Sequence, residues 1–171
     1  MRYFIDTEFI EDGKTIDLIS IGIAAEDGRT YYAISTEFNR RNLTPWLKEN
    51  VIPKLAERYV KFEDSPRIHM SSLAWKSRKR IAKDILEFVG DSPEFWGEYA
   101  SYDWVALCQL YGPMINLPTS WPMFIRDIQQ DTTSGYEFQK MPGHIEHNAL
   151  SDSKECMWRY NILKNEINNI E

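Results

Sequence analysis

The first 35 residues read as three consecutive strands, and this meander limits what the rest of the chain can build. Residues 2–9 and 30–35 are short runs of aromatic and β-branched side chains, and residues 16–25 form the apolar run of a buried strand. Between the second and third runs, Glu26 to Arg29 place Asp-Gly at the centre of a tight turn, which is a strong hairpin signal. The sequence therefore predicts an antiparallel sheet that later elements must cover or extend.

Helical patterns dominate the chain after this meander. Thr44 followed by Pro45 predicts a capped helix that runs to Asn50, and residues 73–89 form an amphipathic helix that Gly90 closes. Further elements are expected as a strand at 94–98, a helix at 101–111, a strand at 121–125, a loop at 129–146 and a helix from 149 to about 167. Strands followed by alternating helices and strands predict an α/β fold with a mixed five-stranded sheet flanked by helices. At this length we expect one domain over residues 1–171.

Composition excludes several classes of protein. The 171 residues carry a formal charge of −6 and are 43% hydrophobic, which is typical of a packed globular chain and excludes disorder throughout. No run approaches the roughly 18 apolar residues of a membrane span. The N-terminus enters a strand without an apolar signal region, so we expect a cytoplasmic protein. The acidic balance disfavours electrostatic coating of nucleic acid, yet it permits an enzyme whose carboxylates are neutralised by bound metal.

Two carboxylates lie in the first strand with one residue between them. Side chains two apart on a strand point to the same face, so Asp6 and Glu8 are expected to project together from an otherwise apolar strand. A buried pair of like charges is costly unless a cation neutralises it, and Mg²⁺ prefers carboxylate oxygen. The alternative is a solvent-exposed strand end, since Asp-x-Glu is a common sequence.

Three residues farther along the chain extend this set of candidates. Asp103 falls in the first turn of the helix at 101–111, where an acid also complements the helix dipole. His147 precedes the last helix and Asp152 lies in its first turn, a placement that suits a histidine base near neutral pH. The alternative roles are ordinary ones: His147 as a surface loop residue, and Asp152 as an acid that complements the dipole of the last helix. Each signal is weak alone, but the order of the four acids and the histidine is specific.

That order resembles the DEDD superfamily of 3′-to-5′ exonucleases: Asp6-x-Glu8 in the first strand, Asp103 in a middle helix, and His147 five residues before Asp152. The histidine spacing marks the DEDDh branch. Longer blocks are similar to ribonuclease AS, a mycobacterial-type exoribonuclease family with a preference for adenylate-containing RNA. The similarity runs from Met1 to about Tyr160 apart from segments 60–72 and 129–146, and its blocks are Phe4 to Gly13, Ile19 to Gly22, Tyr31 to Phe38 and Tyr102 to Leu110.

The resemblance implies an RNase H-like fold and two-metal-ion hydrolysis. Carried over residue by residue, it assigns two Mg²⁺ ions, or Mn²⁺ in their place, to Asp6, Glu8, Asp103 and Asp152, and the general base to His147. The implied reaction releases nucleoside 5′-monophosphates from single-stranded or overhanging RNA 3′ ends, with adenylate preferred. The family also implies a homodimer, and no membrane partner is expected.

Substrate contacts are expected from two places. The first is the strand around the carboxylate pair, where Phe9 is placed to stack against the terminal base. The second is the basic face of the helix at 73–89, whose alternative role is an ordinary solvated surface. The residues concerned are Thr7, Glu8, Phe9, Lys76, Lys79 and Arg80. His144 is a second histidine close to His147, and the five-residue spacing to the last acid selects His147 over it as the base.

Three other functions compete with this interpretation. An exodeoxyribonuclease of the same superfamily differs in whether a 2′-hydroxyl is recognised, and no motif decides this point. A catalytically silent nucleic-acid-binding module has no reason to keep a buried carboxylate cluster. A ribonuclease H-type endonuclease is disfavoured by His147 at the exonuclease spacing. The favoured prediction is therefore a metal-dependent 3′-5′ exoribonuclease.

Overall fold

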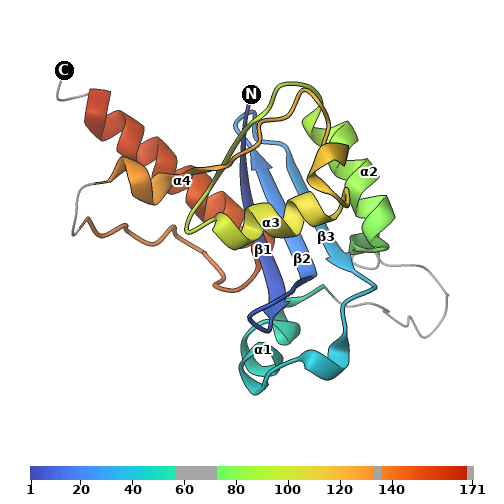
Figure 1. Ribbon diagram of the computed structural model, residues 1–171. Helices are drawn as coiled ribbons and strands as arrows, with labels where there is room; N and C mark the ends of the chain where they lie inside the picture. The colour runs from blue at the N-terminus through green and yellow to red at the C-terminus, as the bar shows by residue number, and fades with distance from the viewer. Residues whose placement is uncertain (57–72, 133–135, 169–171) are drawn as a thin grey trace, which may run out of the picture.

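The computed structural model describes residues 1–56, 73–132 and 136–168 (Figure 1). Segment 60–72, which the family resemblance does not cover, lies outside these described residues. The described strands form one mixed sheet in the order β4-β3-β2-β1-β5-β6, with helices on both faces. This arrangement confirms the predicted α/β class and agrees with the RNase H-like fold that the resemblance implies.

The predicted N-terminal meander is present. β1 (Arg2–Glu11), β2 (Ile16–Ala25) and β3 (Thr30–Ser35) pair antiparallel and form the centre and one side of the sheet. The register of β1 against β2 shifts between Glu8 and Phe9, where a bulge bends the strand. The end of β1 is therefore turned at the position where the sequence places the predicted carboxylate pair.

The other strands are parallel additions to this meander, and they contain the first corrections. β5 (Glu94–Gly97) pairs with β1, and β6 (Arg126–Asp127) pairs with β5. β4 (Trp75–Lys76) pairs with the outer side of β3, so the described sheet has six strands where five were predicted. The strand predicted at 121–125 is wrong, because Trp121 packs into the apolar core and strand pairing begins only at Arg126.

The first two helices show how local caps set helix boundaries. α1 (Pro45–Asn50) begins where predicted, and the Thr44 hydroxyl accepts a hydrogen bond from the backbone N–H of Leu47 as its N-cap. α2 (Arg78–Val89) begins at Arg78 and not at 73, because the chain first pairs with β3 as β4 and Ser77 then caps the helix.

The remaining helices follow the predicted pattern closely. α3 (Ser101–Gln109) and α4 (Ala149–Asn168) occupy the expected regions. The short 3₁₀ helices are η1 (Arg40–Asn42), η2 (Ile52–Lys54), η4 (Met114–Asn116) and η5 (Ile128–Asp131), the last of which lies at the start of the loop predicted at 129–146. Among the described residues, no helix combines the length and the apolar character that a membrane span requires.

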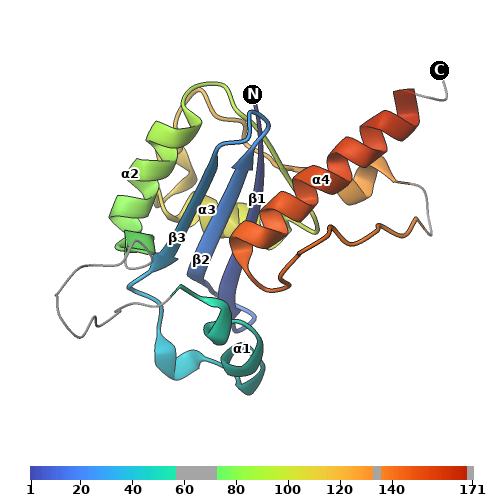
Figure 2. The ribbon, with the colours of Figure 1, turned by 180° about the vertical axis from the view of Figure 1, so that it is seen from behind.

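The helices form two layers around the sheet. Apolar side chains of α2 and α3 pack on one face with Tyr3 and Ile5 of β1, whereas α4 packs on the other face with Phe4. Figure 1 shows α3 in front of the sheet, and Figure 2, from behind, shows α4 in front. A third apolar cluster joins Leu47 of α1 to Ile10 near the end of β1. The far end of β1 therefore lies between α3, α4 and α1.

One close approach fixes the place of α4. A Cβ at Gly22 would lie 2.2 Å from the carbonyl oxygen of Ala149, so the absence of a side chain at Gly22 permits the first turn of α4 to rest directly on β2. Gly22 pairs with Asp6 on the neighbouring strand. The contact therefore brings the first turn of α4 beside the middle of β1.

Candidate active site

Asp6 and Glu8 point toward the α4 side of the sheet. Side chains alternate along β1, so that Phe4 packs on the α4 side and Ile5 packs on the side of α2 and α3. Asp6 and Glu8 continue the Phe4 series and meet Asp152 of α4. Carboxylate oxygens of these three residues lie within 4.8 Å of one another. The structure therefore brings three of the four predicted acids into one cluster.

Asp103 approaches the cluster from the first turn of α3, on the other side of the sheet. Its Oδ1 accepts hydrogen bonds from the backbone N–H of Thr7 at 2.8 Å and from the Thr7 hydroxyl at 2.5 Å. The Asp103 residue is only 7% exposed. It lies close enough to Asp6 to raise the pKa of that carboxyl. Asp103 is thus anchored to β1 beside the cluster, and it is not one of the three acids whose oxygens converge.

Burial and mutual repulsion raise the pKa values of these acids. Burial raises the pKa of Glu8 to about 8, with Asp152 and Asp103 adding to the shift and Lys54 opposing it. The pKa of Asp6 lies well above its ordinary value, first because of burial and then because of the neighbouring carboxylates. The pKa values of Asp103 and Asp152 are also raised, chiefly by burial. A divalent cation is the natural means of neutralising such a set of buried like charges.

His147 lines the same cavity as the acids. Its φ of +60° lies in the left-handed region that is uncommon for a residue with a side chain. Its ring meets Trp46 edge-on, with ring centroids 4.8 Å apart. Lys54 holds the loop on both sides of His147, because its Nζ donates to the Glu146 carbonyl at 2.6 Å and its carbonyl accepts from the Asn148 side chain at 3.1 Å. The loop that carries the predicted base is therefore fastened to α1 and η2.

The cavity has a volume of about 500 Å³, within the range of small-molecule sites. Thr7, Glu8 and Phe9, the predicted substrate contacts of β1, all line it. Trp46 and Tyr99 add further aromatic surface to the lining of the cavity. The cavity therefore combines acids, a histidine and stacking surfaces, which are the groups that a site for one nucleotide and its phosphate requires.

The other predicted substrate contacts, Lys76, Lys79 and Arg80, lie on β4 and α2 and are not among the residues that line this cavity. Lys76 and Arg80 both pair with Asp84, at 2.7 Å and 2.6 Å. The structure thus does not bring this basic face together with the carboxylates, and it gives two of the three cations a partner within the protein.

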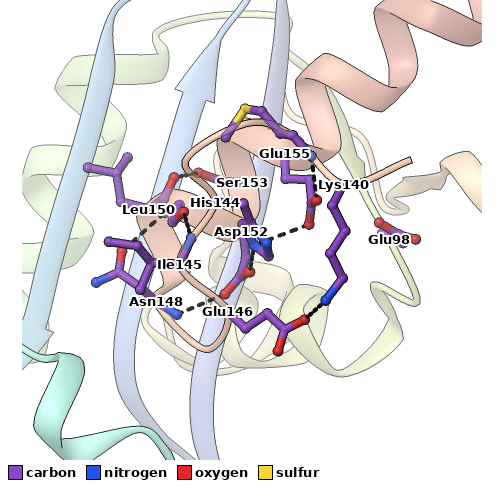
Figure 3. A network of polar contacts seen from close by, with 12 residues as sticks. Glu98, Lys140, His144, Ile145, Glu146, Asn148, Leu150, Asp152, Ser153 and Glu155 are labelled. Carbon is purple, nitrogen blue, oxygen red and sulfur yellow. Dashed lines mark hydrogen bonds and ion pairs between the residues drawn. The ribbon is translucent and has the colours of Figure 1, made fainter. Parts of the chain in front are cut away.

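A polar network behind Asp152 was missed by the sequence reasoning (Figure 3). The Nε2 atom of His144 lies 2.5 Å from Oδ1 of Asp152 and 3.1 Å from Oε2 of Glu155. Arg159 then joins Glu155 to Glu98, with N–O distances of 3.1 Å and 2.6 Å. The four-residue spacing of Glu155 and Arg159 on one helix could have predicted the ion pair between them from the sequence. No local pattern indicated that His144, the histidine that the spacing did not select as the base, would face Asp152.

An α/β sheet with an acid cluster and a histidine in a nucleotide-sized cavity is typical of nucleases. Residues 1–163 match the family model described as the 3′-5′ exoribonuclease Rv2179c-like domain. The chain is also 42% identical over 169 residues to two curated proteins, each named 3′-5′ exoribonuclease: MT2234.1 of Mycobacterium tuberculosis strain CDC 1551 / Oshkosh and Rv2179c of strain ATCC 25618 / H37Rv. Each alignment covers 95% of this chain and 93% of the relative. The chain therefore belongs to the Rv2179c-like 3′-5′ exoribonuclease family, which confirms the family assignment drawn from the sequence.

Proposed function

We propose that this chain is a metal-dependent 3′-5′ exoribonuclease that removes nucleoside 5′-monophosphates from RNA 3′ ends. The observation that carries the proposal is the meeting of Asp6, Glu8 and Asp152 within 4.8 Å of one another, in a cavity that His147 also lines. The M. tuberculosis relatives are named 3′-5′ exoribonucleases, which supports RNA as the polymer and its 3′ end as the point of attack.

Divalent cations fit the acid cluster. Asp6, Glu8 and Asp152 offer the oxygen ligands that Mg²⁺ and Mn²⁺ prefer. Asp103 lies next to this cluster, where its carboxylate accepts a hydrogen bond from the backbone N–H of Thr7. Two such ions, when bound, stabilise the attacking and leaving oxygens of a phosphodiester under hydrolysis. The raised pKa values of Asp6 and Glu8 support this assignment, because these acids gain most from a positive charge placed between them.

His147 is assigned as the general base. Its ring lines the cavity while Trp46 and Lys54 hold the loop around it, so its place does not depend on a bond to any of the acids. In its neutral form the imidazole accepts a proton from the attacking water.

The aromatic wall of the cavity is assigned to the terminal nucleoside. Phe9 lines the wall beside the acids and stacks on Tyr102, with ring centroids 5.8 Å apart and planes 17° from parallel. Tyr99 adds a third ring from the segment before α3, and Thr7 and Glu8 complete this side. Stacking on aromatic rings is the usual way in which proteins bind unpaired bases. A preference for adenylate fits this wall, because a purine offers more surface for stacking than a pyrimidine.

The test is degradation of 5′-labelled single-stranded RNA by the wild type and by the Asp6→Asn variant, with Mg²⁺ or with EDTA. We expect a ladder that shortens from the 3′ end in Mg²⁺ only, with nucleoside 5′-monophosphates as the product on chromatography. Internal cleavage products, or full activity in EDTA, would contradict the proposal. The same strand made of DNA tests the competing exodeoxyribonuclease, and tails of adenylate against uridylate test the base preference.

A homodimer is part of the proposal. α3 exposes Tyr102 and Val105, and η4, the next element along the chain, exposes Met114 and Ile115. Apolar and aromatic side chains of this kind are enriched at the centres of homodimer interfaces. Sedimentation velocity at micromolar concentration is expected to show a dimer, and a monomer at every concentration would contradict this part.

A further inference from the structure

The loop before α4 carries two histidines, and the structure gives them different surroundings. Both line the cavity, but His147 contacts Trp46, whereas the His144 side chain is 6% exposed and faces Asp152 and Glu155. We propose that His144 is a positioning residue, which orients the Asp152 carboxylate toward the metal cluster without binding the metal itself. This inference rests on the proposed function, in which Asp152 is a metal ligand.

Both oxygens of Asp152 are held by the loop. Oδ1 lies 2.5 Å from Nε2 of His144, and Oδ2 accepts a hydrogen bond from the backbone N–H of Asn148 at 2.9 Å. An ionised Asp152 can only accept, and the second neighbour of Nε2 is the carboxylate of Glu155, so Nε2 is the nitrogen that carries the hydrogen. Two hydrogen bonds from separate points of the loop hold the Asp152 carboxylate in one rotational position.

Glu155, the second neighbour of the same Nε2 atom, is itself held in place by other groups; Figure 3 shows it beside His144 and Asp152. Glu155 lies 3.1 Å from Nε2 and accepts the backbone N–H of Met141 at 3.0 Å. Arg159 pairs with Glu155 and also with Glu98, which follows β5. Nε2 thus lies against the proposed metal ligand Asp152 and against a buried carboxylate that Arg159 and Met141 fix, and such neighbours of a ligand help to orient it.

The competing role for His144 is direct metal binding, because ligand atoms of His144, Asp152 and Glu155 also lie within 4.8 Å of one another. Two features favour positioning. The Nε2 distances of 2.5 Å and 3.1 Å to carboxylate oxygens are hydrogen-bond distances. On the other side of Asp152, Asp6 and Glu8 complete an all-oxygen set, which is the set that Mg²⁺ prefers.

A series of variants separates these roles. His144→Ala removes the hydrogen bond, and His144→Gln keeps an N–H donor at about the reach of Nε2. His144→Asn has the same amide on a side chain one carbon shorter, so its N–H does not reach Asp152. Lys140→Ala is the matched control, because Lys140 lies in the same loop and pairs with Glu146 at the surface.

Mn²⁺ binding is measured in the absence of RNA from the electron paramagnetic resonance signal of the free ion, and rates are measured against Mg²⁺ concentration. We expect His144→Ala and His144→Asn to bind Mn²⁺ about 10–100-fold more weakly than the wild type. His144→Gln is expected to stay within about threefold of the wild type, as is Lys140→Ala. At saturating Mg²⁺ the kcat of the weak binders should recover, because the reacting groups are still present. If the role of His144 were merely structural, kcat would fall in every His144 variant, and Gln would be no closer to the wild type than Ala or Asn.

Each possible result decides the question. Equal Mn²⁺ affinity across the His144 variants would overturn the proposal. So would a nitrogen hyperfine coupling in the Mn²⁺-loaded wild type that disappears in His144→Gln, because it would make the imidazole a ligand. If His144→Ala fails to fold, the comparison of Gln with Asn carries the test. Absence of Mn²⁺ binding by the wild type would instead contradict the proposed function.

Discussion

Charge is arranged in opposite ways at α2 and in the cavity beside β1. At α2, opposite charges are paired: Asp84 contacts Lys76 at 2.7 Å and Arg80 at 2.6 Å, and Arg78 contacts Asp17. The acid between two cations is nearly buried, with only 10% of the Asp84 side chain exposed. Every charge in this group has an opposite charge beside it, so the arrangement is complete without a ligand.

In the cavity, like charges gather instead. Asp6, Glu8 and Asp152 converge, and the pKa of Glu8 rises to about 8. Such crowding destabilises the folded protein when the acids are ionised. The difference teaches that a basic stripe in a sequence is weak evidence of a binding surface when acids lie nearby to pair with it. Buried acids that repel one another are stronger evidence of a functional site, because only a ligand completes them.

The largest expected effect comes from breaking the acid cluster itself. Asp6→Asn should lower RNA degradation to below about 1% of the wild-type rate, because it removes a proposed metal ligand. Without metal, the variant should be as stable as the wild type or more stable, because burial and repulsion raise the pKa of Asp6. Gel assays and urea denaturation in EDTA measure the two quantities.

The matched control for that change is the same substitution in the paired region. Asp84→Asn should leave the rate near the wild-type value and lower the free energy of unfolding, because it leaves Lys76 and Arg80 without their shared partner. If Asp6→Asn proved the more destabilising of the two, the contrast between the regions would be wrong.

The next effect concerns the histidine that faces the cavity. His147→Ala should reduce the rate by roughly 10²–10⁴-fold, the usual contribution of a positioned base. Mn²⁺ affinity should change little, because the imidazole is not among the proposed ligands, and this separates His147 from His144. Ile145→Ala, at an exposed position of the same loop, should be active. A His147→Ala variant that kept its rate but lost Mn²⁺ would reverse the roles of the two histidines.

The pH dependence of stability sharpens the comparison further. The folded-state pKa of Glu8 is about 8 and its ordinary value is 4.5, so the unfolded chain releases this proton first. The stability that protonated Glu8 contributes is therefore full below pH 4.5 and is lost as the pH rises through about 8. Urea denaturation at about pH 5, 7 and 9 in EDTA should show a falling free energy of unfolding.

Two changes should flatten that slope. Glu8→Gln removes the titrating group, and the proposed binding of millimolar Mg²⁺ to the folded cluster would hold the acids ionised. A free energy of unfolding that rises across this pH range in the metal-free wild type would contradict the assignment of the cluster as a set of repelling acids.

The smallest effects are expected at α2. Arg80→Ala should cost about 0.3–0.5 kcal/mol of stability, because Arg80, whose own side chain is mostly exposed, pairs with Asp84 at the i, i+4 spacing, and Lys76 stays beside Asp84 in the variant. Arg80→Ala and Lys79→Ala should change kcat and KM for RNA by less than about twofold, since paired or solvated surface cations contribute little. A KM that rises about tenfold in either variant would support the sequence-based prediction that this basic face contacts RNA.

Local sequence pattern accounts for the strands of four or more residues and for the α-helices, but it fails for the two-residue strands. The meander, α1, α3 and α4 follow from alternation, caps and apolar stripes that neighbouring residues carry together. β4 and β6 are two residues long, and no pattern within two residues separates a strand from a loop. They exist because β3 and β5 each present an edge to which a passing segment pairs. The late start of α2 has the same cause.

The sequence by itself determined which acids share a face of β1, because the two-residue period of a strand is a local property. It also determined the family, through blocks of residues and the spacing of His147 and Asp152. Only the tertiary structure decided that Asp152 reaches Asp6 and Glu8, since that meeting depends on how closely α4 rests on β2. It likewise decided that His144 faces Asp152, because contacts between separate elements follow from packing, which no single segment of the chain encodes.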